Sequence, residues 1–569
     1  MKKLFALLLF SGFAASLQAQ EIPRPELARD VVGVTHVAGK YNFTDKDFLN
    51  EGADQILALG SRVIKVWFHR PQNSYPFNSQ WPEMKTLVEM AQAPHFKTLF
   101  DKPFTTFILE AYAPGRPDHY YKNGMTPQQI QRESDDFYAL SKYLLETYKN
   151  TGKTFVLQNW EGDWSLIGAG SEDEPTQTQI EGMVAWFNAR QDGVEKARRE
   201  VGTQGVMVAH AAEVNLIKRA MNGKKSVTND VVPRTRCDLY SSSAYDIQDD
   251  AKSMTAGLDY LAAKAPDSPL YGAKNLFIGE FGFPENNLSG ANKGNTQRDK
   301  TRTALQAALR WGVRYAVYWE LYCNEPIKPL EGKPINADMR GFWLVRPDGS
   351  KAPTWNYLQN MMNFPVSEAG LPFIENIRAF EAADKKQFPA PDQIVFVGSS
   401  SFTNWSNMAR DLAPYPTIRR GFGGSQLGDS LRYAERIIIP YKPKMVVIYA
   451  GDNDIAAGRT PLEVFEDFKA LVAKVHGVLP QTKVTYLSIK PSLSRWHLIG
   501  KIREANNLIE GYAKQDARLS YIDIFPVTLG PDGKPKAELF LEDGLHINQK
   551  GYDLWAAVIK EHLASRYTP

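Results

Sequence analysis

Eight short apolar runs, most of them separated by helical stretches, constrain the fold of the first 364 residues more than any other feature. Helical stretches such as 126–148, 176–201 and 296–311 lie between them. Because a strand followed by a helix recurs eight times, the pattern predicts a TIM (β/α)8 barrel. The runs lie at residues 31–36, 63–68, 105–109, 155–157, 206–209, 239–242, 276–278 and 315–318.

Residues 373–569 show the same alternation with fewer strands. The expected strands include 394–397, 445–449, 484–489 and 519–525, and the expected helices are 461–476, 496–513 and 548–565. About five parallel strands with flanking helices predict a flavodoxin-like three-layer α/β/α sandwich. The expected organisation is a barrel domain over 21–364, a linker over 365–372 and a second domain over 373–569.

Local signals predict several helix ends. Thr44 is expected to cap a helix over 45–59, with Asp47 at its third position and Gly60 as its stop. In the second domain, Thr460 and Glu463 have the spacing of a capping box.

Composition and charge are those of ordinary soluble globular protein, with 43% hydrophobic residues, 23% charged residues and a net charge of +3. No basic tract indicates binding to nucleic acid or to a membrane. Residues 1–20 combine two lysines, an apolar run and small residues, which predicts a cleavable signal peptide.

The two cysteines, Cys237 and Cys323, lie far from the expected cleavage site. We therefore expect a secreted or periplasmic protein without a lipid anchor. The cysteines are expected to be free and buried, although pairing in an oxidising compartment stays open. No metal-binding motif is present, so no metal and no cofactor are implied, and the oligomeric state is left open.

The chemistry of the second domain centres on residues 394–405, IVFVGSSSFTNW. A buried strand that turns abruptly into a helix start exposes a hydroxyl at the carboxyl edge of a sheet. A serine there needs a base, a carboxylate that orients the base, and donors for an oxyanion.

Later segments offer each of these groups. Asp543 and His546 are three residues apart, Gly424 lies in a glycine turn over 420–425, and Asn453 follows the apolar run 445–449. In this order, the four blocks resemble the SGNH (GDSL-like) hydrolase family over roughly residues 373–566. The resemblance implies Ser400 as nucleophile and Asp543 and His546 as acid and base.

The same resemblance assigns the oxyanion donors to Gly424, Asn453 and the Ser400 backbone N–H. Ser399 stands where the family name has aspartate, at a position outside the catalytic set.

In a barrel the catalytic groups lie where the strands end. Glu161 follows the fourth run and Glu280 the seventh, within Gly-Glu-Phe-Gly. A retaining glycosidase requires two carboxylates about 5 Å apart. This placement looks like the clan of (β/α)8 retaining glycoside hydrolases that includes the family 5 cellulases and mannanases.

That resemblance implies Glu280 as nucleophile and Glu161 as acid/base, with Tyr245 near the nucleophile and Trp319 as a sugar platform. The clan has asparagine directly before the acid, whereas Trp160 intervenes here. Asp163 therefore stays open as the alternative acid, and Trp160 and Asp163 are kept as substrate-binding candidates.

Other polar residues follow predicted strands, and we expect at most subsite roles for them: Glu110, His210 and Glu213. Glu280 also has a purely structural alternative, a pair with an arginine such as Arg62.

The leading hypothesis is an exported enzyme that removes acyl groups, most simply acetyl, from a polysaccharide and cleaves glycosidic bonds in the same polymer. Two alternatives stay open: an esterase with a non-catalytic, glycan-binding barrel, and an SGNH lipase or thioesterase.

Overall fold

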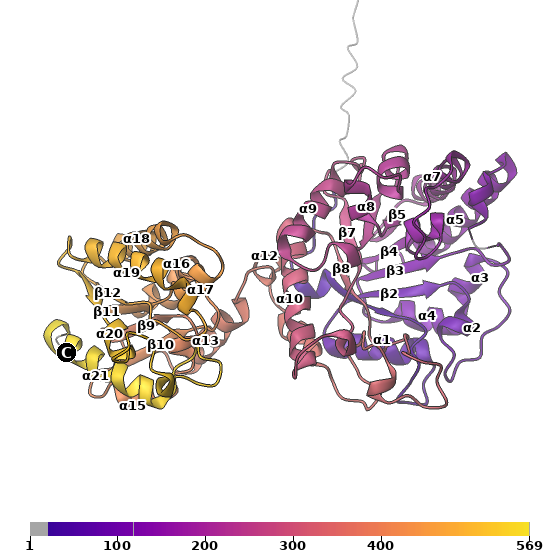
Figure 1. Cartoon of the computed structure of the whole chain (residues 1–569). Helices are drawn as coiled ribbons and strands as arrows, with labels where there is room; N and C mark the ends of the chain where they lie inside the picture. Colours follow the sequence, from indigo (N-terminus) through magenta and orange to yellow (C-terminus); the bar gives the residue numbers. More distant parts are fainter. Residues whose placement is uncertain (1–20, 118, 568–569) are drawn as a thin grey trace, which may run out of the picture. The chain divides into compact units, whose positions relative to one another are not determined.

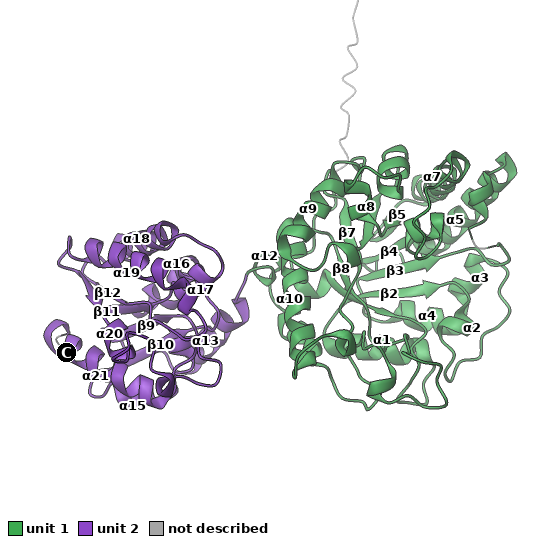
Figure 2. Ribbon diagram, viewed as in Figure 1, with its two compact units in different colours: residues 1–371 green, residues 372–569 purple. Residues whose placement is uncertain are grey.

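The chain divides into two compact units, with the boundary between Leu371 and Pro372 (Figure 2). The computed structural model describes residues 21–117 and 119–567. The expected signal peptide, residues 1–20, lies outside the described residues.

The first unit is a closed barrel of eight parallel strands in sequence order, as the alternation predicts (Figure 1). Pairing of β1 with β8 closes it. The strands are β1 Val32–His36, β2 Val63–Phe68, β3 Thr106–Ala111, β4 Lys153–Gln158, β5 Val206–Val214, β6 Leu239–Ser243, β7 Leu276–Phe281 and β8 Ala316–Tyr318.

Helices surround this barrel and bury the outward faces of its strands. The long helices α5 and α7 pack against each other. The helices are α1 Phe48–Leu59, α2 Pro71–Ser74, α3 Leu87–Gln92, α4 Pro94–Asp101, α5 Pro127–Thr147, α6 Gly162–Ile167, α7 Gln177–Val201, α8 Ile217–Met221, α9 Ala251–Ala262, α10 Lys293–Trp311, α11 Pro353–Met361 and α12 Val366–Ala369.

The cap of α1 differs from the prediction. Asp47 caps the helix by accepting the Asn50 N–H, and Gly60 ends it in the left-handed conformation, at φ 97°. Thr44 instead donates its hydroxyl to the Glu51 carboxylate. Asp47 accepts a backbone N–H that has no partner within the helix. The helix therefore begins three residues later than expected.

The second unit is a five-stranded parallel sheet in the order β10-β9-β11-β12-β13, with helices on both faces (Figure 1). Its strands are β9 Ile394–Gly398, β10 Thr417–Gly421, β11 Met445–Tyr449, β12 Lys483–Leu487 and β13 Leu519–Ile522. The predicted three-layer sandwich is confirmed.

One face of this sheet packs on α21, where Trp555 and Ile559 are buried. Helices α16 and α19 both contact α18 in a separate layer. Thr460 and Glu463 form the predicted capping box of α18. The helices are α13 Ile374–Lys386, α14 Ser400–Thr403, α15 Met408–Asp411, α16 Leu427–Ile437, α17 Asp452–Ala456, α18 Pro461–Val478, α19 Ile499–Ala513, α20 Phe525–Thr528 and α21 Gln549–Arg566.

The expected linker, residues 365–372, is largely ordered structure of the first unit. It contains α12, and the Val366 N–H donates to the Glu26 carbonyl. None of the described helices is both long and apolar enough to cross a membrane. Cys237 and Cys323 are buried and free.

Candidate active sites

The end of β9 presents Ser400 because Gly398 allows an abrupt turn. Gly398 has φ 147°, and a Cβ at this position would lie 1.8 Å from the Tyr449 carbonyl oxygen on the neighbouring strand. Only glycine fits this close approach. The chain then turns into α14, which begins at Ser400.

The structure brings Ser400 together with Asp543 and His546, which lie 143 and 146 residues later in the sequence. The His546 Nε2 lies 3.0 Å from the Ser400 Oγ, and the His546 Nδ1 lies 2.6 Å from an Asp543 carboxylate oxygen. With the proton on Nδ1, Nε2 is free to accept the serine proton.

A short loop fixes Asp543. Its Oδ1 accepts the backbone N–H groups of Leu545 and His546, each at 2.9 Å. Burial acts to raise the pKa of Asp543, but the hydrogen bonds from the His546 ring and the backbone outweigh it and lower this pKa to about 2. The carboxylate therefore stays ionised while it orients the imidazole.

The two loops that carry the oxyanion candidates are hydrogen-bonded to each other. Asn453 Nδ2 donates to the Ser425 carbonyl at 3.0 Å, and the Ser425 hydroxyl donates to the Gly398 carbonyl at 3.2 Å. Gly424 is exposed at φ 81°. A Cβ on the preceding residue, Gly423, would lie 3.8 Å from the Ser400 Cβ, so this turn borders the nucleophile.

Residues 392–554 match the GDSL-like Lipase/Acylhydrolase family. The second unit is similar to this family over these residues. No curated protein matches the chain.

Several solved structures are similar to this part of the chain. A GDSL-like lipase from Bacteroides thetaiotaomicron is 22% identical, with 33% of this chain and 98% of that one covered and a TM-score of 0.30. A lipase/acylhydrolase from Enterococcus faecalis is 22% identical, with 31% and 98% covered and a TM-score of 0.26. A carbohydrate esterase family 3 protein from Talaromyces cellulolyticus is 18% identical, with 31% and 97% covered and a TM-score of 0.25.

Asp543→Asn tests whether Asp543 orients the His546 imidazole. An amide can present its NH₂ to Nδ1, which favours the tautomer with the proton on Nε2 and removes the base from Ser400. We expect kcat for ester hydrolysis to fall by about 10⁴-fold. The measurement is steady-state hydrolysis of 4-nitrophenyl acetate, and a loss of less than tenfold would contradict the assigned role of Asp543.

The barrel holds a separate cavity of about 600 Å³ at the carboxyl ends of its strands. Glu161 and Glu280 both line it. Most of its other walls are aromatic or polar: Trp67, Trp160, Tyr245, Trp319, Phe342, Asn73, Ser74, Asn324, Glu325 and Arg340. Aromatic faces beside carboxylates are suited to binding sugar rings.

Glu280 lines this cavity and is 2% exposed. Its Oε1 lies 2.9 Å from the Lys65 Nζ, and the Tyr245 hydroxyl donates to its Oε2 at 3.2 Å. Burial raises the pKa of Glu280 to about 7, and the charge of Lys65 limits the rise. Its cationic partner is Lys65, whereas the sequence suggested an arginine such as Arg62.

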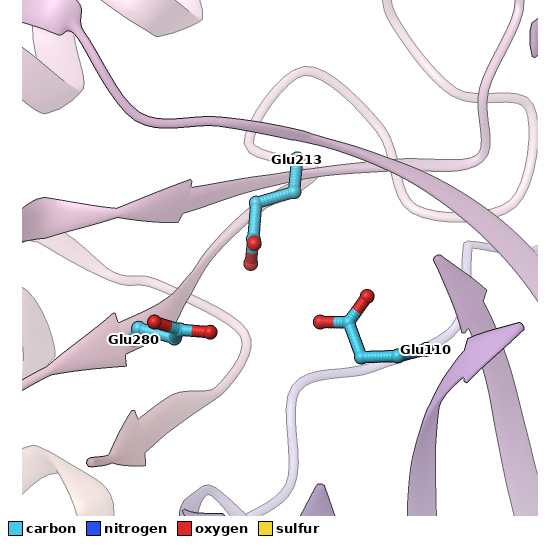
Figure 3. Close-up of side chains that lie close together, drawn as sticks. All are labelled: Glu110, Glu213 and Glu280. Carbon is cyan, nitrogen blue, oxygen red and sulfur yellow. The ribbon is translucent and has the colours of Figure 1, made fainter. Parts of the chain in front are cut away.

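Three glutamates, Glu110, Glu213 and Glu280, point their carboxyl groups toward one another (Figure 3). Lys65 forms ion pairs with all three. Its Nζ is 2.8 Å from Glu110, 3.3 Å from Glu213 and 2.9 Å from Glu280, and all four side chains are buried. Burial raises the pKa of Glu110 to about 8, against the effect of Lys65. A single buried ammonium thus offsets part of the charge of three carboxyl groups.

Glu161 follows β4 and is 8% exposed. Its backbone has φ 30°, and its N–H donates to Glu213 at 3.0 Å. Burial, followed by the charges of Glu280 and Glu213, raises the pKa of Glu161 to about 9. Glu161 therefore holds its proton at a pH at which Glu280 is ionised.

Asp163 does not line the cavity. Its carboxylate is buried and accepts backbone N–H groups from Asn215, Leu216 and Val227, so it ties α6 to the β5 loop. This structural role corrects the expectation that Asp163 contacts substrate, and it leaves Glu161 as the acid candidate.

The remaining strand-end residues have other roles. His210 is buried and packs against Phe137 and Phe187, away from the cavity. Glu213 also accepts from Gln158 and Ser241, so it links β5 to β4 and β6. Lys65 was missed, although a lysine inside the apolar run VIKVWF is an available signal for a charged group inside the barrel.

Proposed function

We propose that this chain is an exported carbohydrate-active enzyme whose second unit removes acyl groups, acetyl in the first instance, from a polysaccharide. The observation that carries the proposal is the hydrogen-bonded set of Ser400, His546 and Asp543. The carbohydrate assignment is supported by the aromatic, carboxylate-bearing cavity on the same chain. Export is proposed from the residue pattern of positions 1–20 alone.

In this reaction Ser400 Oγ attacks the ester carbonyl while His546 Nε2 takes its proton. Asn453 and the N–H groups of Gly424 and Ser400 are assigned to the oxyanion. His546 then protonates the departing sugar oxygen, and water releases the acetyl group from Ser400 by the same steps in reverse. No cofactor takes part.

The barrel is proposed to cleave the same glycan with retention of configuration. Glu280 is the nucleophile because Lys65 and Tyr245 stabilise its carboxylate. Glu161 is the acid/base because its pKa is raised to about 9, above that of Glu280, and it lines the same cavity. Trp160 and Trp319 are proposed to stack against sugar rings.

Joining these activities has a physical rationale. Acyl groups on the polymer obstruct a glycosidase cleft, and a tethered esterase acts at a high local concentration near the chain being cleaved. The test is incubation of the purified protein with a panel of acetylated plant polysaccharides, with free acetate and reducing ends measured separately.

Each outcome of that panel has a distinct meaning. Release of both products supports the full proposal. Acetate without reducing ends assigns the barrel to glycan binding, and failure to release acetate from any glycan, with hydrolysis of simple esters retained, favours the lipase or thioesterase alternative.

The two glutamates predict the pH dependence of the glycosidase. Glu280 must be ionised, so activity rises as pH increases through about 7, and Glu161 must be protonated, so activity falls as pH increases through about 9. We expect a bell-shaped profile of kcat/KM with a maximum near pH 8, and these apparent pKa values belong to the coupled pair. A profile with both limbs below pH 6 would contradict the assignment.

A further inference from the structure

The side-chain amide of Asn453 is held at both of its ends. Its Nδ2 donates one hydrogen to the Ser425 carbonyl at 3.0 Å. Its Oδ1 accepts a hydrogen bond from Arg495 Nη2, also at 3.0 Å. Since an amide NH₂ has two hydrogens, one remains for an oxyanion.

Both partners select the same orientation of this amide. A flip by 180° would place Oδ1 against the Ser425 carbonyl oxygen and would turn NH₂ toward the Arg495 guanidinium. The first contact would join two acceptors and the second two donors, so both hydrogen bonds would be lost. Arg495 and Ser425 together therefore keep the Nδ2 side in the donor position.

Arg495 is itself fixed by a buried acidic residue. Its Nη1 lies 3.2 Å from Asp452 Oδ2, which also lies 3.4 Å from Lys490 Nζ. Asp452 is 4% exposed, and its Oδ1 accepts the Asn453 backbone N–H at 3.0 Å. The Arg495 guanidinium thus contacts both Asp452 and Asn453 in the absence of any substrate.

The same loop also contacts the part of the chain that carries the general base. The Ser494 N–H, next to Arg495, donates to the Gly544 carbonyl at 3.1 Å. Gly544 lies between Asp543 and His546, so residues 494–495 connect the oxyanion side of the site with the imidazole side.

We propose that Arg495 is a positioning residue for ester hydrolysis, which orients and polarises the Asn453 amide so that its free N–H stabilises the oxyanion. A charged donor on the amide oxygen withdraws electron density and strengthens the opposite N–H as a donor. The inference rests on the proposed function of Ser400, and it assigns Arg495 no contact with substrate.

A double-mutant cycle with Asn453 tests this role, using 4-nitrophenyl acetate so that no glycan is needed. Asn453→Ala should lower kcat by about 10²- to 10³-fold. In the native background, Arg495→Met should lower kcat by about 10- to 100-fold with KM changed less than about twofold. In the Asn453→Ala background, the same change should lower kcat by less than about threefold, because the group it positions is gone.

Arg495→Lys keeps the charge beside Asp452 and provides a second variant if Arg495→Met does not fold. A single ammonium cannot reproduce the fork that spans Asp452 and Asn453. We expect an intermediate kcat, and again little effect once Asn453 is alanine.

The inference is overturned if Arg495 variants lose the same fraction of kcat in both backgrounds, if they raise KM alone, or if they retain the native kcat. Absence of Ser400-dependent ester hydrolysis in the native protein would instead overturn the proposed function, and this inference with it.

Discussion

Replacement of Ser400 by alanine should reduce ester hydrolysis by about 10⁶-fold, the scale observed when a serine hydrolase loses its nucleophile. The reason is geometric. Ser400 Oγ is the group held 3.0 Å from His546 Nε2, and alanine leaves that base nothing to activate for attack. The measurement is initial rates on 4-nitrophenyl acetate and on an acetylated glycan.

Ser399→Ala is the matched control. Ser399 is adjacent and fully buried, and its hydroxyl has no hydrogen-bond partner within the described part of the chain. Its removal should leave kcat within about threefold. Substantial hydrolysis by Ser400→Ala, or a comparable loss in Ser399→Ala, would place the nucleophile elsewhere.

The second large effect is expected in the barrel, where Glu280→Ala should abolish release of reducing ends and leave acetate release unchanged. Without this carboxylate no covalent glycosyl intermediate can form. Glu161→Gln should lower the same activity by about 10²- to 10⁴-fold, the contribution of a general acid. Substrates with an acidic leaving group, such as 4-nitrophenyl glycosides, should be less affected by Glu161→Gln.

Glu280→Ala should also fold normally. Lys65 keeps Glu110 and Glu213 as partners, and the buried excess of negative charge decreases. We expect a Tm equal to or above that of the native protein, because catalytic groups are often held at a cost in stability.

Glu325→Gln serves as the control within the same cavity, since Glu325 forms an ion pair with Arg340 at its rim. This variant should retain cleavage, with a changed KM. If Glu280→Ala and Glu325→Gln had equal effects, Glu280 would have no special role as nucleophile. Normal cleavage by Glu280→Ala would refute the retaining mechanism.

Much of the architecture was predictable because it depends on local patterns. Apolar runs of strand length separated by amphipathic helices indicated the closed barrel and the parallel sheet. Strand β10 was not recognised, because its sequence TIRRG carries two arginines, as an edge strand tolerates. The cap at Asp47 was also misassigned, since two nearby side chains were both suitable acceptors.

The serine site was predictable because each block contributes a chemically distinctive residue at a strand end. Asp163 was placed wrongly because position in the sequence does not show where a carboxylate points. The Asp163 carboxylate accepts backbone N–H groups from Asn215, Leu216 and Val227. Each of these residues lies more than 50 positions away in the sequence.

The sequence by itself determined the order of strands and helices and the identity of Ser400, Asp543 and His546 as a candidate set, because short-range periodicity and motif order are written along the chain. Only the tertiary structure decided that Lys65 serves three glutamates from different strands and that Arg495 holds Asn453. These interactions join residues between 42 and 215 positions apart. They exist only once folding excludes water and places the charges within hydrogen-bonding distance.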